Sequence, residues 1–150
     1  MFRSHFSGSL VIVRDPLDSL LSEYNRQAGG HTGHAKDMVG LNNFVNIKLI
    51  NWRNLYLDWL ENSSPGHLLV VSYSQLKTDL RSQLLRMTAF LNVTVTEEVL
   101  NCTMNEREGV FRREKISQDV ILTQHNIQLL SQYKSEVVAA ATKIYRNFVL

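Results

Sequence analysis

Two short apolar segments, each followed directly by a helical pattern, constrain the fold more than any other feature of this sequence. Residues 9–14 (SLVIVR) and 67–73 (HLLVVSY) are continuous apolar runs, a pattern typical of strands buried on both faces of a parallel sheet. Asp15-Pro16 ends the first run, because proline cannot donate to a sheet ladder but suits the first turn of a helix. The order strand, helix, helix, strand, helix predicts an α/β domain with a parallel sheet flanked by helices.

The helices are predicted from apolar residues that recur every three or four positions. Asp15 is a natural N-cap for the first helix. A leucine-rich face runs from Leu76 to Leu91, and the second helix has a wide apolar stripe made up of Leu41, Phe44, Val45, Trp52, Leu55, Tyr56 and Trp59. The stripe of the second helix should be buried. We expect helices at residues 16–28, about 41–59, 76–91, a short one from 96, and 127–148.

Composition limits the classes of partner and compartment that need to be considered. With 44% hydrophobic and 20% charged residues, the 150-residue chain can bury a core, and its net charge of +2 gives no argument for a nucleic-acid partner. No targeting signal or transmembrane segment is recognised in the chain, because no apolar stretch approaches the roughly 20 residues that cross a bilayer. The single cysteine, Cys102, excludes an internal disulfide, and we expect it to be a small buried residue.

The chemistry is expected at the end of the first strand. In open parallel sheets, ligands bind outside the carboxyl ends of the strands, and Arg14 lies at that edge. The helix that begins at Pro16 should add free backbone N–H groups and the positive end of its dipole, and Ser22 could add a hydroxyl donor. This combination favours a phosphate. The alternatives are an ion pair between Arg14 and Asp18 or another carboxylate, and a merely solvated Ser22.

Two segments carry a resemblance to a known family. VRDPLDSLLSEYNR resembles the 3′-phosphate-binding segment of sulfotransferases, in which a strand ends in Arg and a Ser follows eight residues later. LLVVSYSQLKTDLRSQLLRMTAFLNV is similar to a later strand and helix of that family: Tyr73 and Leu76 match, while Ser74 and Gln75 replace an acidic pair. Over residues 9 to about 115, the segments GHTGHA, FVN, DWL, FLNVTVTEEVLNC and EGVFRR narrow the resemblance to the sulfotransferase domain of WSC-domain-containing proteins.

That resemblance implies a fold, a donor, an acceptor and a location. The fold would be a partial P-loop-like sulfotransferase fold, and the co-substrate would be 3′-phosphoadenylyl sulfate, a nucleotide sulfate donor. The acceptor would be a carbohydrate hydroxyl, with sialic acid on glycans expected because the group is associated with sialic acid sulfation. The setting would be the Golgi lumen, with a membrane-anchored parent protein.

The resemblance also implies roles for particular residues. Arg14 and Ser22 would bind the 3′-phosphate, and Tyr73 would lie near the adenine, unless it only caps the core at the strand end. Another loop would fold over the nucleotide, with a glycine for close backbone approach and arginines for phosphate, although an exposed basic turn is the alternative. Its candidate residues are Gly109, Arg112 and Arg113.

The part of the family pattern that holds the 5′-phosphosulfate is not found in these 150 residues. That part is a lysine-containing loop of the type Pro-Lys-Ser/Thr-Gly-Thr, and no catalytic base is evident either. We therefore expect residues 1–150 to form a partial sulfotransferase domain, the C-terminal two thirds, with unassigned catalytic residues and little activity alone. A second hypothesis is a non-catalytic module that binds a glycan or a protein through the aromatic helix around Trp52 and Trp59.

Two further motifs invite interpretation. His31 and His34 form an H-x-x-H pattern in a glycine-rich loop, where no third ligand is evident, so we do not expect a metal site. Three sequons begin at Asn62, Asn92 and Asn101. They would be glycosylation acceptors only if the chain enters a secretory lumen.

Overall fold

The computed structural model describes residues 7–107, 114 and 118–150, which divide into two compact units. The first, here called the strand unit, comprises Met1–Arg14, Tyr56–Arg107 and Val138–Leu150. The second, here called the helix-pair unit, comprises Asp15–Leu55 and Glu108–Val137.

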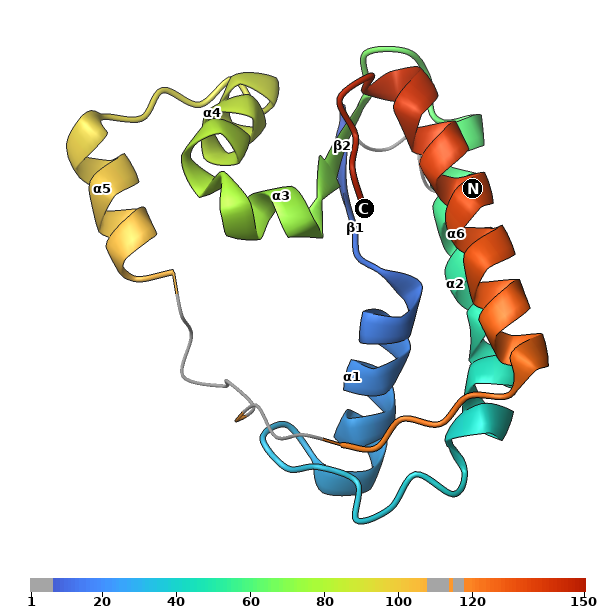
Figure 1. Ribbon diagram of the computed structural model, residues 1–150. Coiled ribbons are helices and arrows are strands. Elements are labelled where there is room, and N and C mark those ends of the chain that lie inside the picture. The colour runs from blue at the N-terminus through green and yellow to red at the C-terminus, as the bar shows by residue number, and fades with distance from the viewer. Residues whose placement is uncertain (1–6, 108–113, 115–117) are drawn as a thin grey trace. The chain divides into compact units, whose positions relative to one another are not determined.

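The strand unit is built on two parallel strands. β1 (Ser9–Val13) lies beside β2 (Leu68–Ser72) and pairs with it (Figure 1). Ser9 is opposite Leu68, and Val13 is opposite Ser72. Val13 and Val71 are fully buried, as expected for apolar strands in a parallel sheet. Both predicted strands and their parallel pairing are confirmed, and the chain is of the α/β class with helices flanking the sheet.

After β2 the predicted leucine-rich helix is two helices. α3 (Tyr73–Thr78) and α4 (Leu80–Phe90) are separated by Asp79, which has a non-helical φ of −141° and accepts a hydrogen bond from the Ser82 N–H. The prediction of one continuous helix was wrong, because an aspartate side chain that caps a new helix competes with continuation of the old one. The buried residue of α4 is Gln83, and Leu91 is 58% exposed.

The chain then forms α5 (Glu97–Asn105), the short helix predicted from residue 96. Thr96 is its N-cap, and the Thr96 hydroxyl accepts from the Val99 N–H at 3.3 Å. Cys102 is on this helix and is exposed, so the expectation that it is buried was wrong. The side of α5 that carries Cys102 faces solvent, whereas Leu100 is the buried residue of this helix.

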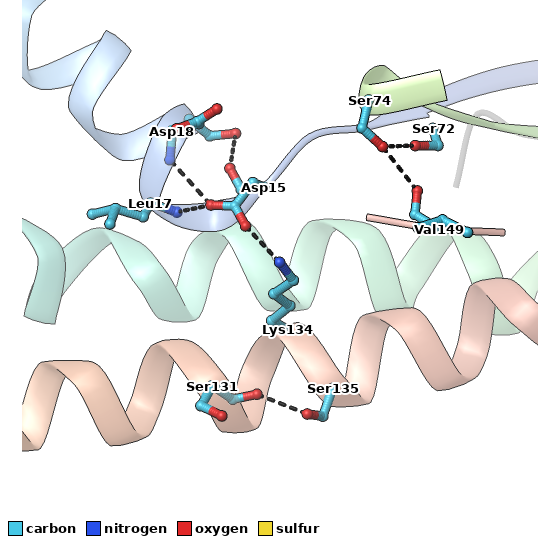
Figure 2. Close-up of polar contacts among 10 residues, drawn as sticks. Asp15, Leu17, Asp18, Ser72, Ser74, Ser131, Lys134, Ser135 and Val149 are labelled. Atoms are coloured by element: carbon cyan, nitrogen blue, oxygen red, sulfur yellow. Dashed lines mark hydrogen bonds and ion pairs between the residues drawn. The ribbon is translucent and has the colours of Figure 1, made fainter. Parts of the chain in front are cut away.

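The last helix, α6 (Gln124–Ile144), ends earlier than predicted, and the rest of the chain forms a tail of residues 145–150. Phe148 lies in this tail and is 6% exposed, so its apolar character reflects burial rather than helix continuation. Ser74 Oγ donates to the carbonyl of Val149 at 3.1 Å (Figure 2), and Gln75 Nε2 donates to that of Asn147 at 2.9 Å. Side chains next to β2 therefore hold the tail.

The helix-pair unit contains α1 (Pro16–Gly29) and the first parts of α2 (Leu41–Asn62) and α6. α2 and α6 run in the same direction, because contacts join Asn42 to Asn126 near both helix starts and Arg53 to Glu136 further along. The interior of the unit is lined mainly by apolar side chains, namely Leu20, Leu41, Val45, Leu49 and Trp52.

One member of the predicted apolar stripe of α2 does not belong to it. Leu55 is 57% exposed, whereas Leu49, which the stripe omitted, is 1% exposed. Residues 41, 45, 49 and 52 are spaced by four and three, so they make a narrower buried face than the one predicted. Among the described residues, no helix is both long enough and apolar enough to cross a membrane.

Candidate functional site

Arg14 and Tyr73 meet at the carboxyl edge of the two-stranded sheet. Each directly follows the last paired residue of its strand, Val13 in β1 and Ser72 in β2. The guanidinium carbon of Arg14 lies 4.9 Å from the centre of the Tyr73 ring, which is within range of a cation–π interaction. Parallel pairing in this register thus brings together two of the residues predicted to bind the nucleotide.

A second cation joins this pair. Lys77 is one turn after Tyr73 on α3, and its ammonium nitrogen lies 5.3 Å from the centre of the same ring. Tyr73 is half-buried, and Ser72 before it is fully buried and caps α3 through its hydroxyl. The Tyr73 ring therefore lies at a strand end with two positive charges close to it, an arrangement suited to an anionic ligand with an aromatic part.

Tyr56 of α2 is a further residue of this edge, although its helical spacing predicts only a place in the apolar stripe of that helix. Its hydroxyl donates to the carbonyl of Ile12 in β1 at 3.0 Å. Burial raises the pKa of Tyr56, and the backbone N–H and charge of Arg14 offset only part of that effect. Helical spacing alone could not reveal that this phenol lies beside the end of β1.

The start of α1 differs from the expectation of free backbone donors. Asp15 caps the helix: one carboxylate oxygen accepts from the N–H groups of Leu17 at 2.9 Å and Asp18 at 3.3 Å (Figure 2). Pro16 has no N–H, and the Ser19 N–H donates to the Asp15 carbonyl. The expected free donors are therefore occupied, because a good N-cap side chain satisfies the very groups that would otherwise bind an anion.

Lys134 of α6 completes this cap. Its ammonium nitrogen lies 2.8 Å from the second carboxylate oxygen of Asp15 (Figure 2). Burial raises the pKa of Asp15, but the hydrogen bond and charge of Lys134, together with the N–H groups of Asp18 and Leu17, outweigh it and leave the pKa below its ordinary value. The carboxylate at the helix start is thus ionised and neutralised by a lysine from a distant part of the chain.

The remaining predicted residues have separate outcomes. Ser22 is half-buried on α1 in the helix-pair unit, whereas Arg14 belongs to the strand unit, so their joint contact with a phosphate stays a prediction. Gly109, Arg112 and Arg113 lie outside the described residues. Trp52 is 7% exposed and belongs to the core, which gives no support to glycan binding through that ring.

The loop that contains His31 and His34 is held in place by hydrogen bonds to residues outside it. Asn25 is buried and its side-chain oxygen accepts from the Ala35 N–H at 2.8 Å, while His34 Nε2 lies 2.8 Å from the carbonyl oxygen of Glu114. In the part of the chain that the structure describes, no group of three or more His, Cys, Asp or Glu side chains is placed to hold a metal ion.

Comparisons with known proteins identify the family. The family model described as "Sulfotransferase domain" matches residues 9–132. The Drosophila melanogaster protein "WSCD family member CG9164" is 35% identical over 117 residues, which cover 73% of this chain and 37% of that protein. The Aedes aegypti protein "WSCD family member AAEL009094" is 34% identical with the same coverage of both chains.

A solved structure has a similar fold. The crystal structure of mouse sulfotransferase SULT7A1 complexed with PAP matches with a TM-score of 0.56, covering 93% of this chain and 59% of that one, at 19% sequence identity. This likeness concerns the fold. The chain spans a little over a third, 37%, of the length of the WSCD relatives. By the family match and by these relatives, the chain belongs to the sulfotransferase-domain family, in its WSCD group.

Proposed function

We propose that this chain supplies the 3′-phosphate and adenine side of the donor site in a sulfotransferase that uses 3′-phosphoadenylyl sulfate. The observation that carries the proposal is the placement of the Arg14 guanidinium over the Tyr73 ring at the carboxyl edge of the sheet. Membership of the sulfotransferase-domain family supports sulfuryl transfer as the reaction class.

The side chains at this edge fit such a donor. An adenosine 3′-phosphate needs an aromatic or apolar surface for its base and a cation for its phosphate, and the Arg14, Tyr73 and Lys77 cluster offers both. A guanidinium can bind two phosphate oxygens at once through its planar set of N–H donors. Ser22 is proposed as a hydroxyl donor to the same phosphate, as the family pattern implies.

The reaction proposed for the whole protein moves a sulfuryl group to a carbohydrate hydroxyl, with sialic acid on glycans as the acceptor. The acceptor oxygen bonds to sulfur, the bond from sulfur to the phosphate oxygen breaks, and the hydroxyl proton passes to a base. Neither that base nor the groups that hold the 5′-phosphosulfate are assigned to residues of this chain. The setting proposed for the reaction is the Golgi lumen, and the parent protein is proposed to be membrane-anchored.

Calorimetry with adenosine 3′,5′-bisphosphate tests the donor assignment. We expect weak binding to the wild-type chain, and weaker binding still of adenosine 5′-monophosphate, which lacks the 3′-phosphate. Arg14→Ala should cost about 1.5–3 kcal/mol of binding free energy, the usual contribution of a charge-assisted contact. Equal affinity for the two nucleotides, or an unchanged affinity in Arg14→Ala, would contradict the proposal.

The matched control is Arg81→Ala, which removes the same charge elsewhere in the strand unit. Arg81 is exposed on α4 and pairs with Glu97 of α5 at 2.6 Å. Its loss should leave nucleotide affinity unchanged, which separates a local effect of Arg14 from the effect of net charge. Circular dichroism of both variants checks that they are folded.

A further inference from the structure

The turn between α4 and α5 carries one of the three sequons of the chain. We propose that Asn92 is an N-glycosylation site, that the fold presents it better than Asn62 or Asn101, and that its glycan covers the exposed apolar side chains of Leu91 and Val93. The inference rests on the proposed luminal location of the chain. It does not depend on nucleotide binding.

The local backbone presents the Asn92 side chain to solvent. Asn92 is exposed and has a φ of 54°, in the left-handed region. Backbone hydrogen bonds hold the turn: the Asn92 N–H donates to Ala89 at 3.1 Å, and the Val93 N–H donates to Thr88 at 2.9 Å. The turn is therefore closed by main-chain groups alone, and the side-chain amide is available for modification.

The backbone conformation of the turn explains the asparagine of this sequon but not its threonine. Asparagine tolerates the left-handed region better than most residues, which would favour it at position 92 for structural reasons. The turn places no such demand on Thr94, two residues later, which is exposed and lies between α4 and α5. Within the described ranges, neither the Asn92 amide nor the Thr94 hydroxyl makes a hydrogen bond. Both groups that a sequon requires are thus accessible.

The other two sequons have a required group engaged in the fold. Asn62 is the last residue of α2, and its side-chain nitrogen donates to both the carbonyl and the carboxylate of Asp58 at 3.1 Å. Asn101 is inside α5, and the hydroxyl of its partner Thr103 donates to the Val99 carbonyl at 2.9 Å. Modification at either site would have to compete with these helix contacts.

The residues on either side of Asn92 give a glycan there a physical role. Leu91 is 58% exposed and Val93 is 52% exposed, so two large apolar side chains flank the acceptor. A bulky hydrophilic glycan attached between them would shield both side chains from other molecules. Without it, they add apolar surface through which chains can associate.

The modification is a substitution at a sugar carbon. The side-chain nitrogen of Asn92 bonds to the anomeric carbon of an oligosaccharide carried on a lipid pyrophosphate. The bond from that carbon to the pyrophosphate oxygen breaks, the lipid pyrophosphate leaves with the electron pair, and the amide proton passes to a base of the transferring enzyme. The co-reactant is therefore a lipid-linked oligosaccharide of the secretory lumen.

Mass spectrometry of the chain after its passage through the secretory lumen tests whether Asn92 is glycosylated. The chain is secreted from insect cells behind a cleavable signal sequence, and peptide N-glycosidase in heavy-oxygen water marks each glycosylated asparagine as labelled aspartate. We expect the label at Asn92, its loss in Asn92→Gln and in Thr94→Ala, and its retention in the matched control Asn101→Gln. Secreted chain without label at Asn92, or with more label at Asn101 than at Asn92, would overturn the proposal.

Light scattering on heating tests the covering role. Asn92→Gln should aggregate at a lower temperature than the glycosylated wild type, and adding Leu91→Ser and Val93→Ser should restore the wild-type temperature. If Asn92→Gln and glycosylated wild type aggregate alike, the covering role is wrong. A chain that binds adenosine 3′,5′-bisphosphate but carries no glycan would refute this inference alone, while a glycosylated chain that binds no nucleotide would refute only the proposed function.

Discussion

The Arg14 guanidinium carbon lies 4.9 Å from the centre of the Tyr73 ring, although the two residues are far apart in the sequence. They meet because Val13 of β1 is paired with Ser72 of β2, and Arg14 and Tyr73 are the residues that follow this pair in the two strands. The carboxyl ends of parallel strands meet at one sheet edge, so register alone decides this contact.

The contact between Arg14 and Tyr73 should be measurable as a coupling free energy. In a double-mutant cycle of Arg14→Gln and Tyr73→Leu, we expect about 0.5–1 kcal/mol of coupling, the usual size of a partly exposed cation–π interaction. Urea unfolding of the wild type, the two single variants and the double variant gives the value. Additive effects of the two substitutions would show that the contact is energetically irrelevant.

The Asp15 cap should contribute to stability through two separable parts. Asp15→Ala loses both the cap of α1 and the ion pair with Lys134, and should cost about 1 kcal/mol of unfolding free energy. Asp15→Asn keeps a capping oxygen and loses the charge, so its cost should be smaller. Urea unfolding near neutral pH measures both variants, and an equal loss in the two would mean that the cap contributes nothing.

Acid should weaken the wild type more than Asp15→Asn. The folded-state pKa of Asp15 lies below its ordinary value of 3.8, so the unfolded chain takes up the proton first as the pH falls. The stabilisation is therefore complete above the ordinary pKa and is lost as the pH falls through the folded-state pKa. Urea midpoints of the two proteins should converge on acidification from neutral pH, and a constant difference would contradict the assigned ion pair.

Arg86 should not be replaceable by lysine. Its guanidinium carbon is 3.7 Å from the Tyr145 ring centre, and its terminal nitrogens donate to Gln83 at 2.6 Å and to the Val70 carbonyl at 3.1 Å. A lysine ammonium group is not planar, so it cannot stack on the tyrosine ring and donate hydrogen bonds to both acceptors at the same time. Arg86→Lys should therefore lower the unfolding free energy by about 1.5–3 kcal/mol in urea titrations.

The matched control for Arg86 is Arg81→Lys on the same helix. Arg81 is exposed and forms an ion pair at 2.6 Å with Glu97, which is exposed as well, so this replacement should change stability by less than about 0.5 kcal/mol. Similar losses in the two lysine variants would mean that the planar contacts of Arg86 are not the cause.

Cys102 should react with a thiol reagent in the folded chain. It is exposed on α5, so Ellman's reagent should titrate one thiol per chain without denaturant, and none in Cys102→Ser. A reaction that needs urea would indicate that the thiol is buried, as the sequence had suggested.

The sequence alone predicted strands and helix starts correctly where they depend on residues that are neighbours in the chain. The two apolar runs predicted β1 and β2 to within a residue, and Asp15-Pro16 and Thr96 predicted the starts of α1 and α5. These features depend on strand burial, proline chemistry and side-chain capping within a few residues of each other. The α/β class and the position of Arg14 at a strand end follow from them.

Burial and helix ends were predicted less well. The position of Phe148 predicted more helix, but it is a buried residue of the tail after α6, and Leu55 is exposed although its spacing fits an apolar stripe. An apolar residue by itself shows neither that its position is buried nor which element covers it. Asp79 was not recognised as the break between α3 and α4, because polar residues between leucines are also expected on the exposed face of a continuous amphipathic helix.

By itself, the sequence determined the strands, the cap of α1 and the cation at the end of β1, since each depends on neighbours in the chain. Only the tertiary structure decided that Tyr73 lies beside Arg14, that Tyr56 reaches the end of β1, and that Lys134 neutralises Asp15. Those contacts join residues from distant elements, and their geometry depends on strand register and helix packing, which no local pattern encodes.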